Sequence, residues 1–450
     1  MNLSALLRSS ALVAVGAVSA IAVSPLVTDS SAQATDPSVP EFGKLFAVYQ
    51  RIQASYVEPV DDEKLIRGAI DGMLASLDPH SSYIDGAEMR RLETLIDGNY
   101  SGLGLSVISE DGAVKIISPF RGSPADKAGL KAGDYITHLD GELIYGRDLD
   151  EAVAQMRGPE GTSIRLTVFR PGREEPFEVD VTRGVIELEP VTHELAAGNI
   201  GVITVNEFSR DVGSDVYSSW MSLQKEAAGR MNGLVLDLRS NPGGSLDEAV
   251  ALSDLFLKKG RIVSQRGRAR GETLLYDAET VFRGDMAEGV PIIVLIDAGS
   301  ASASEIVAGA LQDHRRALVM GERSFGKGSV QSLLPLTRTT ALKLTTARYF
   351  TPSGHSVQEG GIKPDIMIPQ LSDPDYAKRS KYVLRESDLK GHLINEVGLK
   401  DEELESDKLA DPRFRKTADE LKAEGVEDFQ LHYALETLRR TTPSAVALRK

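Results

Sequence analysis

The stretch DAGSASASEIVAGALQDHRRALVMGERSFGKGSVQ, residues 297–331, combines serines with one lysine in a setting that could support acyl transfer. A serine attacks a carbonyl only when a base accepts its proton, and this stretch has no obvious histidine and aspartate pair. Lysine can replace that pair. The candidate chemistry therefore uses Ser302 or Ser304 as nucleophile and Lys327 as base.

A lysine base must be neutral near pH 7, and this requirement predicts its surroundings. Its ordinary pKa of ~10.4 would have to fall by roughly 3 units, about 4 kcal/mol of differential desolvation. Gly326 and Gly328 would let backbone pack closely around the lysine, and Gln331 could orient the amine without adding a charge. We therefore expect Lys327 to be buried.

Two other interpretations compete for these residues. Ser302 and Ser304 could serve only as a helix N-cap, the usual role of serine before a helix. GERSFGKG nearly matches the phosphate-binding G-x-x-x-x-G-K-[ST] loop, but Gly328 occupies the position of the required hydroxyl and Ser329 comes one residue late. This mismatch argues against a nucleotide site, whereas the N-cap interpretation stays open.

Regular elements must position these side chains. The apolar run Pro291 to Ile296 predicts a strand buried on both faces, and Ala301 to Leu311 predicts a helix after the turn at Gly299. The free N–H groups at the start of this helix would stabilise an oxyanion. A second strand, Ala317 to Met320, leads into the lysine loop, and the strand predicted from Ala341 to Phe350 is expected to continue the sheet.

The motifs SASASE and GERSFGKGSVQ resemble the core of the C-terminal processing peptidases, also called tail-specific proteases. The resemblance covers residues 40–370 approximately. It implies an α/β protease core of the ClpP and crotonase type, with Ser302 as nucleophile, Lys327 as base and Gln331 as its helper. It implies no metal, nucleotide or organic cofactor.

A second motif of the same family is the loop LRSNPGG, residues 238–244. The resemblance implies that this loop lies beside the nucleophile and supplies an oxyanion donor from Gly243 or Gly244, with the Ala303 N–H as the second donor. A Schellman-like turn would explain the glycines alone, but not their occurrence together with the serine motif. We expect Arg239 to brace the loop.

Short strands and turns begin at Asn99 and include a predicted strand from Ser163 to Phe169, and SPADKAGLKAGD with the preceding GLGL resembles a PDZ domain. Successive backbone N–H groups of a glycine loop can bind a terminal carboxylate, and a neighbouring strand edge can take up the peptide. The carboxylate loop would comprise Gly102, Leu103, Gly104 and Leu105. We therefore expect protein or peptide substrates with free C-termini.

The N-terminus has Arg8, an apolar stretch from Ala11 to Val23 and an A-x-A sequence ending at Ala34, the form of a secretory signal peptide. An uncleaved membrane anchor facing the periplasm is the alternative. We expect a periplasmic protein with five regions: signal peptide 1–34, N-terminal helical segment 35–96, inserted PDZ domain 97–185, serine protease core 186–370 and C-terminal helical extension 371–450.

Two further features lie outside the core motifs. His80, which follows Asp78-Pro79 where a helical pattern breaks, is expected to cap a turn. Tyr433, Leu435 and Leu438 predict an apolar stripe on a terminal helix, which we interpret as an assembly element. Partners of this kind would be a second copy of the chain or an activating adaptor.

The composition excludes several other functions. The chain of 450 residues has a formal net charge of −15, which argues against nucleic acid as a partner. It has no cysteine, and its seven histidines lack metal-ligand spacing. A secreted, non-catalytic peptide-binding module is the alternative function, but such a module has no need of a buried lysine beside a serine.

Overall fold

The computed structural model describes residues 40–86, 100–186, 190–373, 385–395 and 414–441, apart from 111–112, 120–122, 132, 148, 171–172, 174, 269–272, 279–283, 390 and 415. The chain forms two compact units: residues 90–189, and the remainder of the chain. The expected signal peptide and its A-x-A site lie outside the described residues. The bounds of the five expected regions stay predictions.

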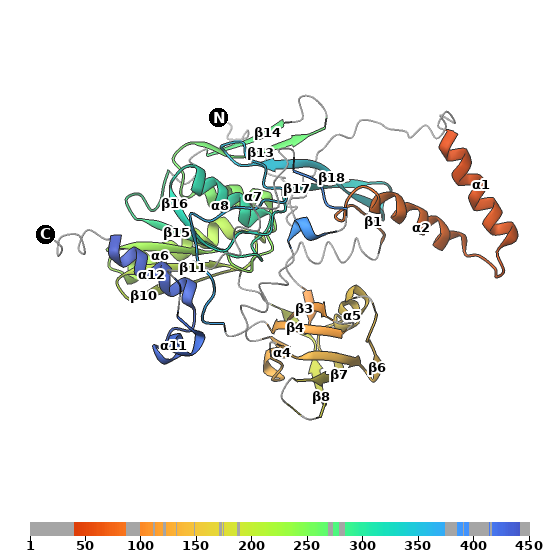
Figure 1. Cartoon of the computed structure of the whole chain (residues 1–450), viewed down its shortest axis with the longest axis horizontal. Helices are drawn as coiled ribbons and strands as arrows, with labels where there is room; N and C mark the ends of the chain where they lie inside the picture. Colours follow the sequence, from red (N-terminus) through yellow and green to blue (C-terminus); the bar gives the residue numbers. More distant parts are fainter. Residues whose placement is uncertain are drawn as a thin grey trace, which may run out of the picture. The chain divides into compact units, whose positions relative to one another are not determined.

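The larger unit is built on a six-stranded sheet with the order β10-β11-β12-β15-β16-β19 (Figure 1). Its strands are β10 (Val191–Ala196), β11 (Ile200–Val205), β12 (Gly233–Asp237), β15 (Ile292–Ile296), β16 (Ala317–Gly321) and β19 (Ile366–Met367). All neighbours pair in parallel except β10 and β11. Every residue of β12 and β15 is buried, as continuous apolar strands require.

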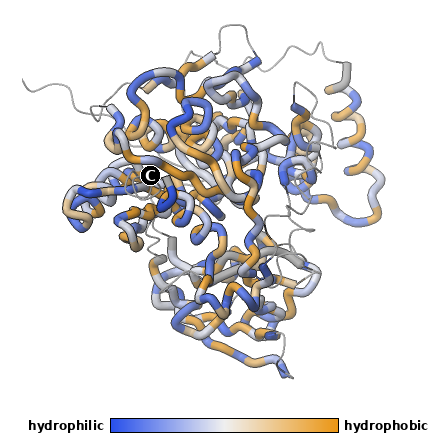
Figure 2. Tube along the Cα trace, turned by 60° about the vertical axis from the view of Figure 1, so that its left-hand side comes forward, coloured by the Kyte–Doolittle hydropathy of each residue, from blue (hydrophilic) through white to orange (hydrophobic). Residues whose placement is uncertain are grey.

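Alternate residues of the central strands enter two different hydrophobic clusters. Leu234, Leu236 and Val294 face one cluster, which contains α6 (Val212–Glu226), α7 (Leu246–Asp254) and α8 (Ala303–Asp313). Val235 and Leu295 face the other cluster, which contains α11 (Ala418–Ala423) and α12 (Phe429–Thr441). Hydrophobic residues are accordingly concentrated toward the centre of this unit (Figure 2). The sheet is covered by helices on both faces.

The C-terminal helix α12 therefore belongs to the core. Leu438 is 2% exposed, and Tyr433 and Leu435 pack against the same cluster. We expected this stripe to mediate assembly, and that interpretation is wrong, because the stripe covers the chain's own sheet.

An antiparallel sheet adjoins the helices and carries the loop with the predicted base. It has the order β1-β18-β13-β14, with β17 also paired to β18. Its strands are β1 (Ser82–Ile84), β13 (Gly260–Gly267), β14 (Thr273–Ala278), β17 (Ser329–Pro335) and β18 (Ala341–Phe350). We expected residues 341–350 to continue the parallel sheet. That expectation is wrong, because β17 and β18 form a hairpin that pairs elsewhere.

The N-terminal segment supplies α1 (Pro40–Ser55), α2 (Asp62–Ala75) and strand β1, which pairs with β18. Asp61 caps α2 by accepting a hydrogen bond from the Lys64 N–H. Within the described ranges, no helix is both long and apolar enough to span a membrane.

The smaller unit has its own core around a sheet with the order β3-β4-β5-β7-β8, with β6 paired to β5. The elements are β2 (Tyr100–Gly102), β3 (Leu105–Glu110), β4 (Ala113–Pro119), α4 (Pro124–Lys127), β5 (Tyr135–Leu139), β6 (Glu142–Leu143), α5 (Leu149–Met156), β7 (Ser163–Phe169), β8 (Phe177–Thr182) and β9 (Gly184–Ile186). Strands β2 and β9 pair separately where the chain enters and leaves this unit.

Candidate active site

Ser302 lies at the junction between β15 and α8, directly before the first helical residue. Its φ of 53° and ψ of −109° are unusual for a residue with a side chain, and such a conformation costs about 1–3 kcal/mol. The side chain is 1% exposed, and its Oγ has no hydrogen-bond partner in the described part of the chain. A serine that served only as an N-cap would use this oxygen to accept a helix N–H.

Ser304, the other candidate nucleophile, is committed to a structural bond. Its Oγ donates to the Asn241 carbonyl oxygen at 3.0 Å and is buried. Of the two serines, Ser302 is therefore the one whose hydroxyl is available for chemistry.

Lys327 lies in the loop between β16 and β17. Burial lowers its pKa, and the positive charge of Lys343 lowers it further, while Glu386, Glu305 and Asp78 act in the opposite direction. The pKa of Lys327 is lowered overall, as a lysine base requires. Because Ser302 Oγ has no hydrogen-bond partner among the described residues, Lys327 Nζ is not bonded to it in this conformation.

Glu305 connects the two candidate residues and was not predicted from the sequence as a site residue. Its Oε2 accepts hydrogen bonds from the Ser302 N–H (2.7 Å) and the Lys327 N–H (3.0 Å). Its Oε1 accepts from the Gly326 N–H (2.7 Å) and from Ser324 Oγ (2.6 Å). The backbones of the nucleophile and of the base therefore meet at one carboxylate oxygen.

Two effects act on the ionisation of Glu305. Its complete burial raises the pKa of the carboxyl to about 7, while the four hydrogen-bond donors favour the charged form. The sequence did contain a signal, because Ser302 and Glu305 have the S-x-x-E spacing of a capping box. In this spacing the glutamate reaches back to the N–H of the N-cap residue, as it does here.

Gln331 lies on β17 and is 2% exposed. Its Nε2 donates to Ser329 Oγ at 2.9 Å and to Thr345 Oγ1 at 3.3 Å. In this structure the amide group is thus bonded to its own strand and to β18, and the expected bond to Lys327 is not among the contacts of the described residues.

The glycine loop after β12 lies directly against the nucleophile. A methyl group on Gly243 would come within 2.9 Å of Ser302 Cβ and 2.8 Å of the Ala301 oxygen, and the Gly243 φ of +102° favours glycine. The Gly243 N–H donates to Asn241 Oδ1 at 2.9 Å. Among the described residues, the N–H groups of Gly244 and Ala303 have no acceptor, so both can donate to another molecule.

Arg239 braces the base of this loop. It donates to Asp237 Oδ1 (2.8 Å), to both carboxylate oxygens of Asp428 (2.9 and 2.7 Å) and to Gln430. Asp428 and Gln430 lie at the start of α12. The C-terminal extension is thereby linked to the loop beside Ser302.

Comparison with known proteins identifies the family. The model of peptidase family S41 matches residues 199–368, a PDZ domain model matches residues 118–170, and the model of the activating protease CtpB N-terminal domain matches residues 16–88. A carboxy-terminal-processing protease of Bartonella bacilliformis is 46% identical over 376 residues, which are 83% of this chain and 85% of that protein. The chain belongs to the carboxy-terminal processing proteases of family S41.

More distant members agree with this assignment. The carboxy-terminal processing protease CtpB of Bacillus subtilis is 36% identical, over 82% of this chain and 75% of that protein. The solved structure of a photosystem II D1 C-terminal processing protease is 27% identical with a TM-score of 0.54, over 78% of this chain and 92% of that one. The predicted α/β protease core, PDZ domain and terminal helical segments are confirmed, and the chain is a serine protease.

The predicted carboxylate loop of the PDZ domain connects two strands of this S41 protease. Gly102 ends β2, Leu105 begins β3, and Gly104 between them has a φ of 74°. The carbonyl oxygens of Leu103 and Gly104 accept bonds from the Ala125 N–H and from Ser123 Oγ. These bonds fix the loop from its carbonyl side.

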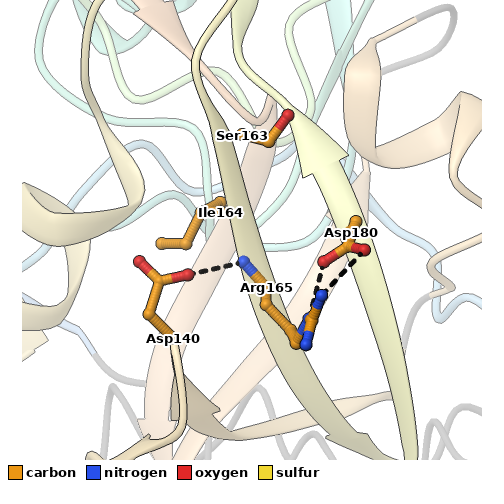
Figure 3. A pocket seen from close by; sticks show the side chains of 5 residues that line it. All are labelled: Asp140, Ser163, Ile164, Arg165 and Asp180. Carbon is orange, nitrogen blue, oxygen red and sulfur yellow. Dashed lines mark hydrogen bonds and ion pairs between the residues drawn. The ribbon is translucent and has the colours of Figure 1, made fainter.

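A hollow elsewhere in the PDZ domain is lined by Asp140, Ser163, Ile164, Arg165 and Asp180 (Figure 3). Its charges already pair with one another: Arg165 Nε donates to Asp180 at 2.8 Å, and the Arg165 N–H donates to Asp140 at 2.8 Å. It contains no residue of the carboxylate loop.

Proposed function

We propose that this S41 protease cuts periplasmic proteins near their C-termini through a dyad of Ser302 and Lys327, and that its PDZ domain recognises the substrate's C-terminus. The dyad is supported by the buried Ser302 Oγ, which has no hydrogen-bond partner among the described residues. The backbone N–H groups of Ser302 and Lys327 donate to the same Glu305 oxygen, and the pKa of Lys327 is lowered.

In the proposed reaction, Ser302 Oγ attacks the scissile carbonyl carbon as its proton passes to neutral Lys327 Nζ. The Gly244 and Ala303 N–H groups stabilise the oxyanion. Collapse of the tetrahedral intermediate breaks the C–N bond, and Lys327 gives its proton to the leaving amine. Water then hydrolyses the acyl-enzyme with Lys327 again as base. Gln331 orients the amine once its side chain has turned from Ser329.

Alanine substitutions test the dyad. Ser302→Ala and Lys327→Ala should each abolish cleavage of an unstructured protein, with products followed by mass spectrometry. Their thermal unfolding should change little, because each substitution removes a reacting group. Ser304→Ala is the matched control, since it removes only the bond to the Asn241 oxygen and should keep most of the activity. An active Ser302→Ala enzyme would refute the nucleophile assignment.

The proposed location rests on the signal-like N-terminus. N-terminal sequencing of the mature protein should find a start near Thr35. Retention of Met1 would favour the membrane-anchored alternative instead.

A further inference from the structure

The turn Asp78–Ser81, in the N-terminal segment, contacts Glu386, a residue that bonds to the loop that carries Lys327. His80 Nε2 lies 2.9 Å from Glu386 Oε1 and 3.0 Å from Oε2, across 306 residues of sequence. Glu386 is fully buried. We expected His80 to cap a turn, but Asp78 is the residue that caps it, by accepting bonds from the His80 and Ser81 N–H groups.

Glu386 in turn holds both ends of the loop that carries Lys327. Its backbone N–H donates to the Phe325 oxygen at 3.1 Å. Its carboxylate accepts from Gln358 Nε2 at 3.0 Å, and Gln358 Oε1 accepts from the Gly328 N–H at 3.1 Å. A continuous chain of hydrogen bonds therefore runs from the His80 ring to the residue next to Lys327.

The same turn also reaches Gln331 by a separate route. Ser81 Oγ donates to Asp78 Oδ2 at 2.9 Å and accepts from the Thr345 N–H at 3.1 Å. Thr345 Oγ1 is one of the two acceptors of the Gln331 amide. The loop of Lys327, the proposed base, and the side chain of Gln331, which is proposed to orient that base, are thus both supported from this turn.

We propose that His80 is a positioning residue of the protease, which holds the Lys327 loop in place through Glu386 and Gln358. This inference rests on the proposed Ser302 and Lys327 dyad. A buried carboxylate requires partners that supply hydrogen bonds, so loss of the His80 ring leaves Glu386 to rearrange together with Gln358. Displacement of a reacting group by about 1 Å can cost ~100-fold in rate.

The test measures kcat and KM of the full-length protein on one peptide. His80→Ala should lower kcat by about 10- to 100-fold and leave KM within about twofold, because the base and not the substrate contact is displaced. His80→Gln, whose amide N–H can still donate to Glu386, should recover most of kcat. Gln358→Ala combined with His80→Ala should be little slower than either single variant, because both act through one carboxylate.

His392→Ala is the matched control. His392 Nε2 bonds to Glu359 Oε1 at 2.7 Å and likewise joins the C-terminal stretch to the loop of residues 358–360. The Glu359 carboxylate also accepts from the Asn395 N–H, outside the Lys327 loop, whereas the bond of Glu359 to that loop is made by its backbone N–H, which donates to the Gly326 oxygen at 2.9 Å. This variant should keep kcat within about threefold of the unsubstituted enzyme.

The possible results separate the two proposals. An unchanged kcat in His80→Ala, or equal losses of kcat in His80→Ala and His392→Ala, would overturn the positioning role of His80. The dyad would still be supported in that case if Lys327→Ala is inactive. Failure of His80→Gln to recover activity would also count against it. Full activity of Lys327→Ala in the same assay would instead refute the dyad itself.

Discussion

The proposed site contains two ionisable groups, Glu305 and Lys327, whose protonation is expected to lower the activity in the same direction. As pH falls through about 7, Glu305 takes up a proton and loses acceptor capacity toward the Ser302 and Lys327 N–H groups. Lys327 also becomes protonated below its own lowered pKa and cannot act as base. We therefore expect log kcat/KM to rise with pH, with a slope that approaches about 2 on the acid side.

A pH series with a single peptide substrate measures this slope. A slope of about 1 throughout the acid side would mean that only one of the two groups controls the reaction. Thermal unfolding at each pH is the control, because it separates loss of chemistry from loss of fold.

Gly243 allows a second prediction for a single residue. Gly243→Ala should abolish cleavage, because its methyl group would collide with the Ala301 oxygen and with Ser302 Cβ. Gly229, whose φ is +73° and whose added methyl would meet nothing within 4 Å, is the control. Gly229→Ala should cost about 1 kcal/mol of stability and leave kcat unchanged. Similar cleavage rates in the two variants would contradict the close approach.

At the scale of elements, α12 is expected to be required for folding of the protease core. Leu438→Ala removes a side chain that packs on β12 and should lower the free energy of unfolding by about 2–5 kcal/mol. Leu336→Ala, at a position 55% exposed, should change it by less than about 0.5 kcal/mol. Denaturant titration measures both, and equal effects would show that α12 is peripheral.

The sequence was sufficient to predict elements whose pattern is local. The bounds predicted for the strands at residues 163–169 and 341–350 agree with the structure, because apolar residues and turn residues delimit them. The sheet predicted for β18 was wrong. The strand pairs with β17 in a hairpin and with β1, and no local sequence pattern reveals these partners.

The same distinction holds for the site. Ser302, Lys327 and the glycine loop could be found from motifs, whereas the contacts of Glu386, His80 and Gln358 could not. These three residues are far apart in sequence, and each is an ordinary polar residue in its own segment. Only the folded chain joins them into the hydrogen bonds that support the Lys327 loop.

At the scale of the whole molecule, the PDZ domain is expected to make cleavage depend on a free C-terminus. Amidation of a peptide's C-terminus should lower kcat/KM several-fold or more, because the loop of residues 102–105 would lose a charge-assisted hydrogen-bond acceptor. Equal values for the acid and the amide would exclude recognition of the terminal carboxylate.

The variant that lacks residues 99–182 is the control for this comparison. It should cleave the acid and the amide forms of the peptide at equal rates. Its overall rate separates two roles of the domain. Lost activity indicates delivery of substrate or activation, whereas raised and indiscriminate activity indicates an inhibitory gate.

The bond between His80 and Glu386 also bears on when the enzyme becomes active during its own synthesis. Contacts between distant parts of a chain form only after the intervening segments have been made and folded. The support of the Lys327 loop needs residues from near both ends of the chain. A chain that has been synthesised only in part therefore lacks the complete loop support, and we expect proteolytic competence to arise only after residue 386 has joined the fold.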